Sequence, residues 1–163
     1  MAQVGDAAAI ASIYNEGIED RIATFETEPR TPQAIAAQLV ALADRYPAMV
    51  VEQDARVGGF AWAAEYRPRK AYKAVAEFSV YVARQVRGQG VGRLALSALI
   101  REAESRAFTK LVSRIFPENL ASRRLCADLG FREVGLYRRH GRLDGRWMDC
   151  VIVERLLGDA ARA

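Results

Sequence analysis

The sequence predicts an α/β fold, in which a central mixed, mostly antiparallel β-sheet is flanked by about four α-helices. Two observations carry this prediction. Apolar residues recur at helical spacing in some segments and alternate with polar residues in others. Three strand-like segments also follow one another directly, which a repeated βαβ unit with an all-parallel sheet does not allow. Because the 163 residues contain no repeat or linker-like stretch, we expect residues 1–163 to form a single domain.

Helices are expected at the start of the chain. In residues 6–19 the apolar side chains fall at helical spacing, and Asp6 is placed to cap the first turn. A second helix begins at Thr31, a capping residue followed by the proline favoured at the first helical position, and runs towards Arg45. The residues between them, 22–30, have mixed character and are interpreted as a loop.

The rest of the chain combines strands and helices. Strands are predicted at residues 48–53, 57–66 and 75–83, and we expect these neighbours to pair antiparallel. A long helix follows at residues 90–106, with an apolar stripe of Val91, Leu94, Ala95, Ala98 and Leu99. The remaining segments are a strand at 111–116, a helix at 119–129 ended by Gly130, and strands at 131–137 and 147–156.

The composition narrows the possible chemistry. The single histidine, His140, could be joined as a soft metal ligand only by Cys126 and Cys150, which lie at no recognised zinc spacing. We therefore expect no metal site, and a Ser-His-Asp or Cys-His mechanism would have to use His140. Two cysteines, no apolar leader and charges that interrupt every apolar run favour a cytoplasmic protein without a membrane segment.

The basic residues are almost all arginine, since only Lys70, Lys73 and Lys110 are lysines among the 24. Arginines can be spread over a solvated surface or gathered in anion-binding sites, and composition alone favours the first. A nucleic-acid-binding module is a further alternative, which requires clustered basic residues interleaved with exposed aromatic residues. The one dense run of arginines, at residues 138–146, is diluted by Asp144 and Asp149, so we expect no nucleic-acid partner.

The stretch Arg87-Gly88-Gln89-Gly90-Val91-Gly92 lies between a predicted strand and a predicted helix. Alternate glycines let the backbone approach a ligand, and the helix N-terminus offers unpaired N–H groups to an anion such as a pyrophosphate. The spacing fits neither the dinucleotide fingerprint nor the P-loop. The glycines are equally consistent with a tight turn that uses them for shape alone.

A carboxylate stands in the strand just upstream. Alternation places Ala76, Phe78, Val80 and Val82 on one face of this strand and Glu77, Ser79 and Tyr81 on the other. In an apolar setting the pKa of Glu77 would rise towards the range in which it can accept a proton near neutral pH. The strand by itself favours the alternative, an ordinary solvent-facing residue.

Together these segments resemble the GNAT superfamily of acetyl-CoA-dependent N-acetyltransferases. Arg87, Gly90 and Gly92 match its cofactor motif, Arg/Gln-x-x-Gly-x-Gly/Ala, which follows a central strand. The run Asn119-Leu120-Ala121-Ser122, followed by Leu129-Gly130-Phe131, looks like the helix that borders the cofactor in this superfamily. The resemblance covers nearly the whole chain and implies the GNAT fold, N-acetyltransferase activity and acetyl-CoA as cosubstrate.

Within the superfamily the chain is most similar to the phosphinothricin and arsinothricin N-acetyltransferases, and residues 22–31 look most like the arsinothricin branch. The segments that carry this resemblance are Ile13-Tyr14-Asn15, residues 25–32, Arg45-Tyr46-Pro47, Arg69-Lys70-Ala71-Tyr72, Glu77 with residues 80–82, and residues 145–149. The implied reaction is acetylation of the α-amino group of a small amino-acid-like antibiotic, which confers resistance. Acetylation of methionine derivatives, protein N-termini or polyamines on the same fold is the alternative.

The resemblance also implies roles for individual residues. Glu77 occupies the position of the general base, so the strand pattern and the resemblance agree on it. The implied cofactor contacts are backbone groups at Val80, Tyr81 and Val82, the pyrophosphate loop Arg87, Gly88, Gln89, Gly90, Val91 and Gly92, and Asn119 with Ser122 on the next helix. The implied acceptor contacts are Arg69 and Tyr72, with Phe25 and Thr27 as weaker candidates.

The chain departs from the superfamily at two places. Many members have a tyrosine, and the phosphinothricin enzymes a histidine, where this chain has Cys126; we expect solvent rather than a dedicated acid to protonate the leaving thiolate. Relatives usually open with a short strand, of which residues 1–5 are a poor remnant, so we expect a shortened or frayed first strand. Because relatives are commonly homodimers, we also expect a homodimer.

Overall fold

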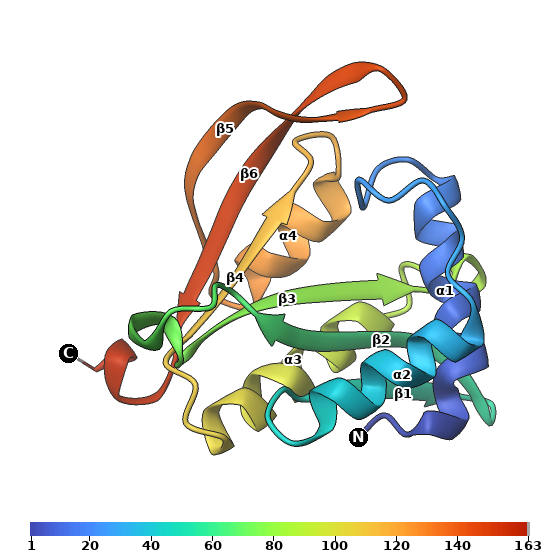
Figure 1. The fold of residues 1–163 in the computed structure, drawn as a ribbon, viewed down its shortest axis with the longest axis horizontal. Helices are drawn as coiled ribbons and strands as arrows, with labels where there is room; N and C mark the ends of the chain where they lie inside the picture. Colours follow the sequence, from blue (N-terminus) through green and yellow to red (C-terminus); the bar gives the residue numbers. More distant parts are fainter. Residues whose placement is uncertain (163) are drawn as a thin grey trace.

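The computed structural model describes residues 1–162 of the chain. It contains a six-stranded sheet in the order β1-β2-β3-β4-β6-β5, in which only the β3–β4 pair is parallel (Figure 1). The strands are β1 (Ala48–Gln53), β2 (Arg56–Glu65), β3 (Val75–Val82), β4 (Lys110–Ile115), β5 (Arg132–Leu143) and β6 (Arg146–Leu156). The four α-helices are α1 (Ala7–Glu19), α2 (Pro32–Ala43), α3 (Val91–Ser105) and α4 (Leu120–Asp128). The predicted mixed, mostly antiparallel sheet with four helices is confirmed.

The helices cover the two faces of the sheet separately. Helices α3 and α4 bury one cluster, which includes Phe78, Leu96, Leu99 and Cys126, against the central strands. Helices α1 and α2 bury a second cluster on the opposite face over β1, β2 and the end of β3. Residues on opposite faces of β3 join different clusters, Phe78 the first and Tyr81 the second, so this strand is covered on both faces.

At the start of the chain the structure agrees only in part with the prediction from the sequence. Thr31 caps α2 as predicted, since its hydroxyl accepts a hydrogen bond of 3.1 Å from the backbone N–H of Ala34. Asp6 precedes α1, but its carboxylate accepts from the backbone N–H of Gln3 instead of capping the helix. Before α1 the structure has a short 3-10 helix, Val4–Asp6, and the N–H of Ala2 bonds to the carbonyl of Ala48. The sequence predicts a shortened or frayed first strand; within the described residues the chain forms no strand before α1, and this single hydrogen bond to β1 stands in its place.

Two details of the later elements differ from the prediction. The apolar stripe of α3 is rotated, because Leu94 is exposed while Leu96 and Ile100 are buried. Strand β5 runs to Leu143, six residues beyond the predicted end at Tyr137. Its pairing with β6 shifts register between Glu133 and Gly135 and again between Tyr137 and Gly141. Such bulges interrupt the alternation on which a prediction from the sequence depends.

Candidate active site

The most distinctive feature of the sheet is an opening between its two parallel strands (Figure 1). The β3–β4 ladder ends at the pair Glu77 and Val112, although β3 continues to Val82 and β4 to Ile115. Beyond Glu77 the backbone groups of β3 that face β4 therefore have no strand partner. A segment of extended chain placed there could form hydrogen bonds with β3 as an added strand does.

A small cavity of about 60 Å³ lies in this opening, between β3, β4 and α4. Four residues that the sequence predicts for the cofactor line it together, namely Val80, Tyr81, Asn119 and Ser122. Ser79, Arg114 and Cys126 line it as well. The structure thus brings the strand motif and the α4 motif to one place, although they are about 40 positions apart in sequence.

The glycine loop lies between β3 and α3. Gly88 and Gly90 have φ angles of +76° and +85°, and a Cβ atom added at either would meet no heavy atom within 4 Å. The loop therefore needs glycine for its backbone conformation, and its outer surface is open to a ligand. Helix α3 begins at Val91 without a side-chain cap, so its first N–H groups are available to an anion. At Gly92 a Cβ would press on Leu125 and Val82, so this glycine serves packing.

Arg87 lies beside this loop, where its guanidinium is held by protein groups. Its Nε donates to the carbonyl of Val82 at 3.1 Å, and its Nη1 forms an ion pair of 2.8 Å with Asp20. Burial alone would raise the pKa of Asp20, but hydrogen bonds from Arg84 and Arg87 outweigh it and hold the pKa below its ordinary value. A pyrophosphate bound by Arg87 would therefore compete with Asp20.

Asn119 is committed to the protein framework by both ends of its amide. Its Oδ1 accepts from the backbone N–H of Ser122 at 3.1 Å and so caps α4, as expected of an asparagine at a helix start. Its Nδ2 donates to the carbonyl of Ile22 at 3.1 Å. Asn119 thus connects α4 to the segment that follows α1, and its role next to the cavity is to fix these two elements.

Glu77 lies at the point where β3 and β4 separate, and its setting is polar rather than apolar. Arg114 on β4 donates from Nε at 2.8 Å and from Nη2 at 2.6 Å, both to Oε1 of Glu77. The Glu77 side chain is 27% exposed and that of Arg114 49%. The sequence does not predict a role for Arg114. Only the parallel β3–β4 pairing brings Arg114 beside Glu77, 37 positions away. A charged residue on the predicted inner strand at 111–116 was the one available hint.

Arg69 and Tyr72 lie in a separate cavity of about 530 Å³. Five basic residues line it with the single carboxylate of Glu65: Arg45, Arg67, Arg69, Lys70 and Lys73. The ring of Tyr72 packs edge-on against Tyr66 at a centroid distance of 5.6 Å. The structure therefore groups the two predicted acceptor contacts with one another and with an excess of positive charge, but not with the cavity beside Glu77.

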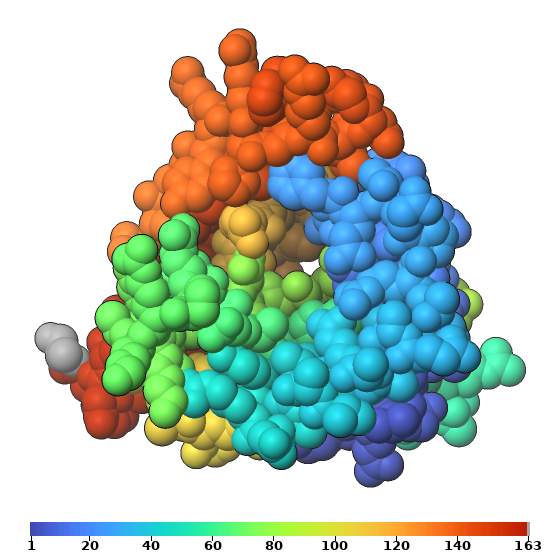
Figure 2. Space-filling view, in the orientation of Figure 1, coloured from blue at the N-terminus to red at the C-terminus, as the bar shows by residue number. Residues whose placement is uncertain are grey.

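The molecular surface has a hollow between segments that are distant in the sequence (Figure 2). It is bordered by the β5–β6 hairpin in orange, the segment after α1 in blue and the segment between β2 and β3 in green. The segment after α1 contains Phe25 and Thr27. Phe25 packs edge-on against Phe116 at 4.9 Å, whereas Thr27 is exposed. Phe25 is thus held in place against the residue that follows β4, in the segment that borders the hollow.

Cys126, at the departure from the superfamily pattern, is buried with 1% of its surface exposed. Burial, with a smaller contribution from the charge of Glu133, raises the pKa of its thiol to about 12. An acid this weak does not readily protonate an ordinary thiolate, whose conjugate thiol has a pKa near ~8.5. The geometry therefore gives Cys126 a place in the wall of the cavity without the acidity that a general acid needs.

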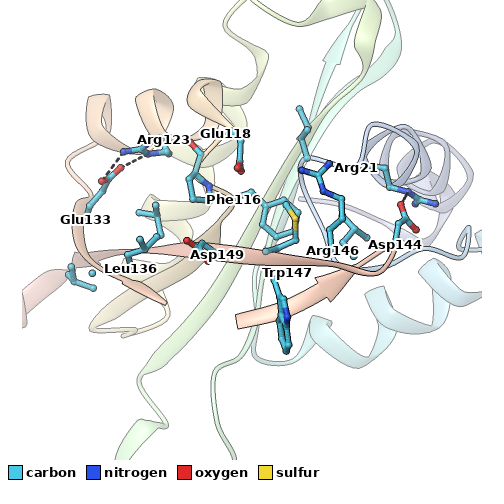
Figure 3. Close-up of a pocket in the computed structure, with 17 residues that line it drawn as sticks. Arg21, Phe116, Glu118, Arg123, Glu133, Leu136, Asp144, Arg146, Trp147 and Asp149 are labelled. Atoms are coloured by element: carbon cyan, nitrogen blue, oxygen red, sulfur yellow. Dashed lines mark hydrogen bonds and ion pairs between the residues drawn. The ribbon is translucent and has the colours of Figure 1, made fainter. Parts of the chain in front are cut away.

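A third cavity, of about 950 Å³, lies between the β5–β6 hairpin and the start of α4 (Figure 3). Arg123 and Glu133 form a two-bond ion pair at one end, and Arg21 and Asp144 pair at the other. Trp147, at 52% exposure, points away from the other labelled residues (Figure 3). None of the residues predicted for catalysis, cofactor or acceptor lines this cavity.

The residues at the opening fit acetyl-CoA. The loop with Gly88 and Gly90 leaves an open cradle before the uncapped N-terminus of α3, which suits a pyrophosphate. The unpaired edge of β3 suits the amide groups of a pantetheine arm. Within residues 1–162 no group of three or more His, Cys, Asp or Glu side chains is arranged to hold a metal ion. In the same part of the chain, no helix is long and apolar enough to cross a membrane.

Comparison with known proteins connects this geometry to a family. Residues 10–131 match the family described as "Acetyltransferase (GNAT) family". The phosphinothricin N-acetyltransferase of Alcaligenes faecalis is 36% identical over 154 residues, which cover 93% of this chain and 78% of that protein. An L-methionine sulfoximine/L-methionine sulfone acetyltransferase of Salmonella typhimurium is 33% identical, covering 98% of this chain and 94% of the relative.

Solved structures agree with the sequence relatives. A GNAT superfamily phosphinothricin acetyltransferase from Sinorhizobium meliloti, solved with acetyl-CoA, superposes with a TM-score of 0.92 at 30% identity and covers 99% of this chain and 89% of its own. A ribosomal-protein-alanine N-acetyltransferase from Brucella melitensis also gives 0.92 at 32% identity, covering 96% and 97%. The opened parallel pair, the glycine loop and the relatives lead to one conclusion: the chain belongs to the GNAT family and is an acetyl-CoA-dependent N-acetyltransferase.

Proposed function

We propose that this enzyme acetylates the α-amino group of a small amino-acid-like antibiotic, arsinothricin or phosphinothricin, and thereby confers resistance. The observation that carries the proposal is the position of Glu77. Its carboxylate lies where the β3–β4 ladder ends, next to the cavity that residues of the cofactor motifs line. The names of the relatives support an amino-acid-like acceptor, since they include phosphinothricin and methionine sulfoximine acetyltransferases.

In this proposal Glu77 acts as the general base. Acetyl-CoA, when bound, supplies an acetyl thioester whose C–S bond breaks as the C–N bond to the acceptor forms. Glu77 takes one proton from the acceptor ammonium, directly or through a water molecule, so that the nitrogen gains a free electron pair. The nitrogen loses a second proton after the new bond forms, and solvent returns a proton to the sulfur. Each turnover therefore releases one proton overall.

The remaining predicted residues bind and orient the two substrates. Backbone N–H groups at Val80 to Val82 hold the pantetheine arm and polarise the thioester carbonyl. The loop from Arg87 to Gly92 holds the pyrophosphate. Arg69 and Tyr72 bind the distal anionic group of the acceptor, for which the excess of positive charge in their cavity is suited.

The test is an assay of thiol release from acetyl-CoA with arsinothricin, phosphinothricin, methionine sulfoximine, an alanine-terminated peptide and spermidine. We expect turnover with the first three, and a kcat about 10²- to 10⁴-fold lower for Glu77→Gln with unchanged affinity for acetyl-CoA. Glu52→Gln, at an exposed position of β1, is the matched control. Turnover with only the peptide or only spermidine would contradict the proposed amino-acid-like acceptor. Near wild-type turnover by Glu77→Gln would show that Glu77 is not the general base.

We further propose that the protein is a cytoplasmic homodimer whose interface includes the β5–β6 hairpin. Five large apolar side chains of this hairpin are more than 40% exposed: Val134, Leu136, Tyr137, Trp147 and Leu156. Exposed apolar side chains grouped on one element are typical of an association surface. Light scattering during gel filtration is expected to give twice the mass of 18.0 kDa, and Leu136→Glu to return the protein to a monomer.

A further inference from the structure

The ion pair between Glu77 and Arg114 has features that a merely structural pair does not need. Both donors of Arg114 converge on Oε1 of Glu77. Within residues 1–162, Oε2 of Glu77 and Nη1 of Arg114 have no hydrogen-bond partner. The pair therefore presents one acceptor and one donor, with opposite charges, next to each other.

The residues directly opposite this pair on the outer neighbouring strands are uncharged. Beside Glu77 on β2 lies Ala64, and beside Arg114 on β6 lies Ile152. On the side between them the ladder ends at Glu77 and Val112, so Arg114 stands beyond the last paired residues. Arg114 also lines the small cavity with Val80 and Asn119. Its guanidinium thus spans from the predicted base to the opening that contains the cofactor motifs.

The pair is complementary in charge to a zwitterionic α-amino acid. Oε2 of Glu77 can accept a hydrogen bond from an ammonium, and Nη1 of Arg114 can donate one to a carboxylate. A free α-amino acid has both groups, and they are attached to the same carbon atom. When the ammonium approaches Glu77, the carboxylate comes within reach of Arg114.

We propose that Arg114 is the residue that binds the α-carboxylate of the acceptor and so selects free α-amino acids. This inference rests on the proposed function, with Glu77 as base, and adds the chemical class that the site accepts. The acceptor exchanges one ion pair for two: its carboxylate binds Arg114 and its ammonium binds Glu77. Arg69 and Tyr72 are then left for the distal group of the acceptor.

The proposal predicts that the enzyme distinguishes acceptor classes by one chemical group, the α-carboxylate. A peptide N-terminus has an amide where a free amino acid has its carboxylate, and a polyamine has no acidic group near its amine. Either would bring an ammonium to Glu77 without a partner for Arg114. In either case the guanidinium of Arg114 gains no carboxylate in exchange for Glu77, and its uncompensated charge is costly in a partly buried site.

The test compares one acceptor with and without the α-carboxylate, using phosphinothricin and its α-carboxamide. Wild-type enzyme is expected to have a kcat/KM about 10- to 100-fold lower for the carboxamide, the range expected for losing a charged hydrogen-bond pair. Arg114→Gln is expected to lose a similar factor with phosphinothricin, mainly through KM, and to change less than about 3-fold with the carboxamide. Arg114→Lys should recover part of the loss, because it keeps the charge.

Two controls distinguish this inference from a structural effect and from the proposed function. Arg132→Gln removes another exposed arginine that pairs with a carboxylate, Glu154, and is expected to leave both substrates unaffected. Glu77→Gln should lower kcat by the same factor on both substrates, because the base serves either. Equal losses on both substrates for Arg114→Gln, or no loss on either, would overturn the inference and leave the acetyltransferase of amino acids in place. Failure of wild-type enzyme to acetylate phosphinothricin while it acetylates the carboxamide would overturn both.

Discussion

The proposed cofactor side and the proposed acceptor side of this site are built in different ways. The cofactor side consists of the end of β3, the glycine loop, α3 and the start of α4, all within residues 75–130. The acceptor side combines the segment after α1, the segment between β2 and β3, and the β5–β6 hairpin (Figure 2). One contiguous region thus contains the contacts proposed for the cosubstrate, whereas three distant segments border the hollow proposed for the acceptor. A change in one of those segments can therefore alter the acceptor without disturbing the cofactor side.

The two sides also differ in how they are held in place. Behind the cofactor side lies the main cluster, which contains seventeen buried residues including Leu96, Leu99 and Phe78. Two of the three acceptor-side segments, the one after α1 and the β5–β6 hairpin, meet at a small cluster of three buried residues, Phe116, Leu143 and Cys150, against which Phe25 packs. Burial of apolar surface dominates stability, so most of the stability is expected to come from the cofactor side.

The strongest test of this difference is a pair of truncations, Leu99→Ala and Phe25→Ala. Leu99 is fully buried, so its truncation should lower the free energy of unfolding by about 2–5 kcal/mol. Phe25 is only partly buried at the edge of the small cluster, so its loss should cost less than about 2 kcal/mol. In kinetics the order should reverse, since Phe25→Ala should raise the KM for the acceptor.

Urea unfolding at pH 7 and steady-state kinetics with both substrates measure these effects. Ile100→Ala, in the same cluster as Leu99, is a second variant, so that the comparison does not depend on Leu99 alone. A larger loss of stability from Phe25→Ala than from Leu99→Ala would show that the acceptor side is part of the main folding unit.

The sequence predicts the cofactor side well because its determinants are local. The alternation from Val75 to Val82 identifies the strand, and the three glycines that follow it identify the turn into α3. Thr31 and Pro32 fix the start of α2 in the same way, through the capping hydroxyl and the missing N–H. Each of these features depends on neighbours within a few residues, which the sequence itself contains.

The features that the sequence does not predict depend on contacts between distant segments, which no local pattern encodes. The Glu77–Arg114 pair requires the parallel pairing of β3 with β4, and the length of β5 requires two bulges opposite β6. The exposed position of Leu94 has a similar origin, because the covered face of α3 is set by the strands beneath it. Sequence periodicity identified these elements but could not determine which of their residues would meet.

A smaller effect is expected from adding one methyl group on each side of the site. Gly90→Ala imposes a left-handed φ of +85° on a residue with a Cβ, which should lower the free energy of unfolding by about 1–2 kcal/mol. The strained loop should also raise the KM for acetyl-CoA. Gly141→Ala places its Cβ 2.7 Å from the ring of Phe25, so this ring must shift and the KM for the acceptor should rise.

Each glycine variant is the control for the other, because both add the same group. The KM for acetyl-CoA and the KM for the acceptor are measured for both variants. Gly90→Ala should change only the first several-fold, and Gly141→Ala only the second. If Gly90→Ala raised the KM for the acceptor as much as that for acetyl-CoA, the two sides would not be separable.

The smallest effect is expected at Cys126, which lies in the cavity between the two sides. Cys126→Ala should keep kcat within about 3-fold of wild type. Burial keeps the thiol protonated, so it is a poor proton donor, and solvent can supply the proton in its place.

The effect of Cys126→Ala should instead appear in the free energy of unfolding at high pH. The folded pKa of about 12 lies above the ordinary value of 9.0, so the unfolded chain loses this proton first. Stability of the wild type should therefore fall as pH rises from 9 towards 12, and part of that fall should be absent in Cys126→Ala. A kcat that dropped by 100-fold, with acetyl-CoA still bound, would instead identify Cys126 as the acid of the reaction.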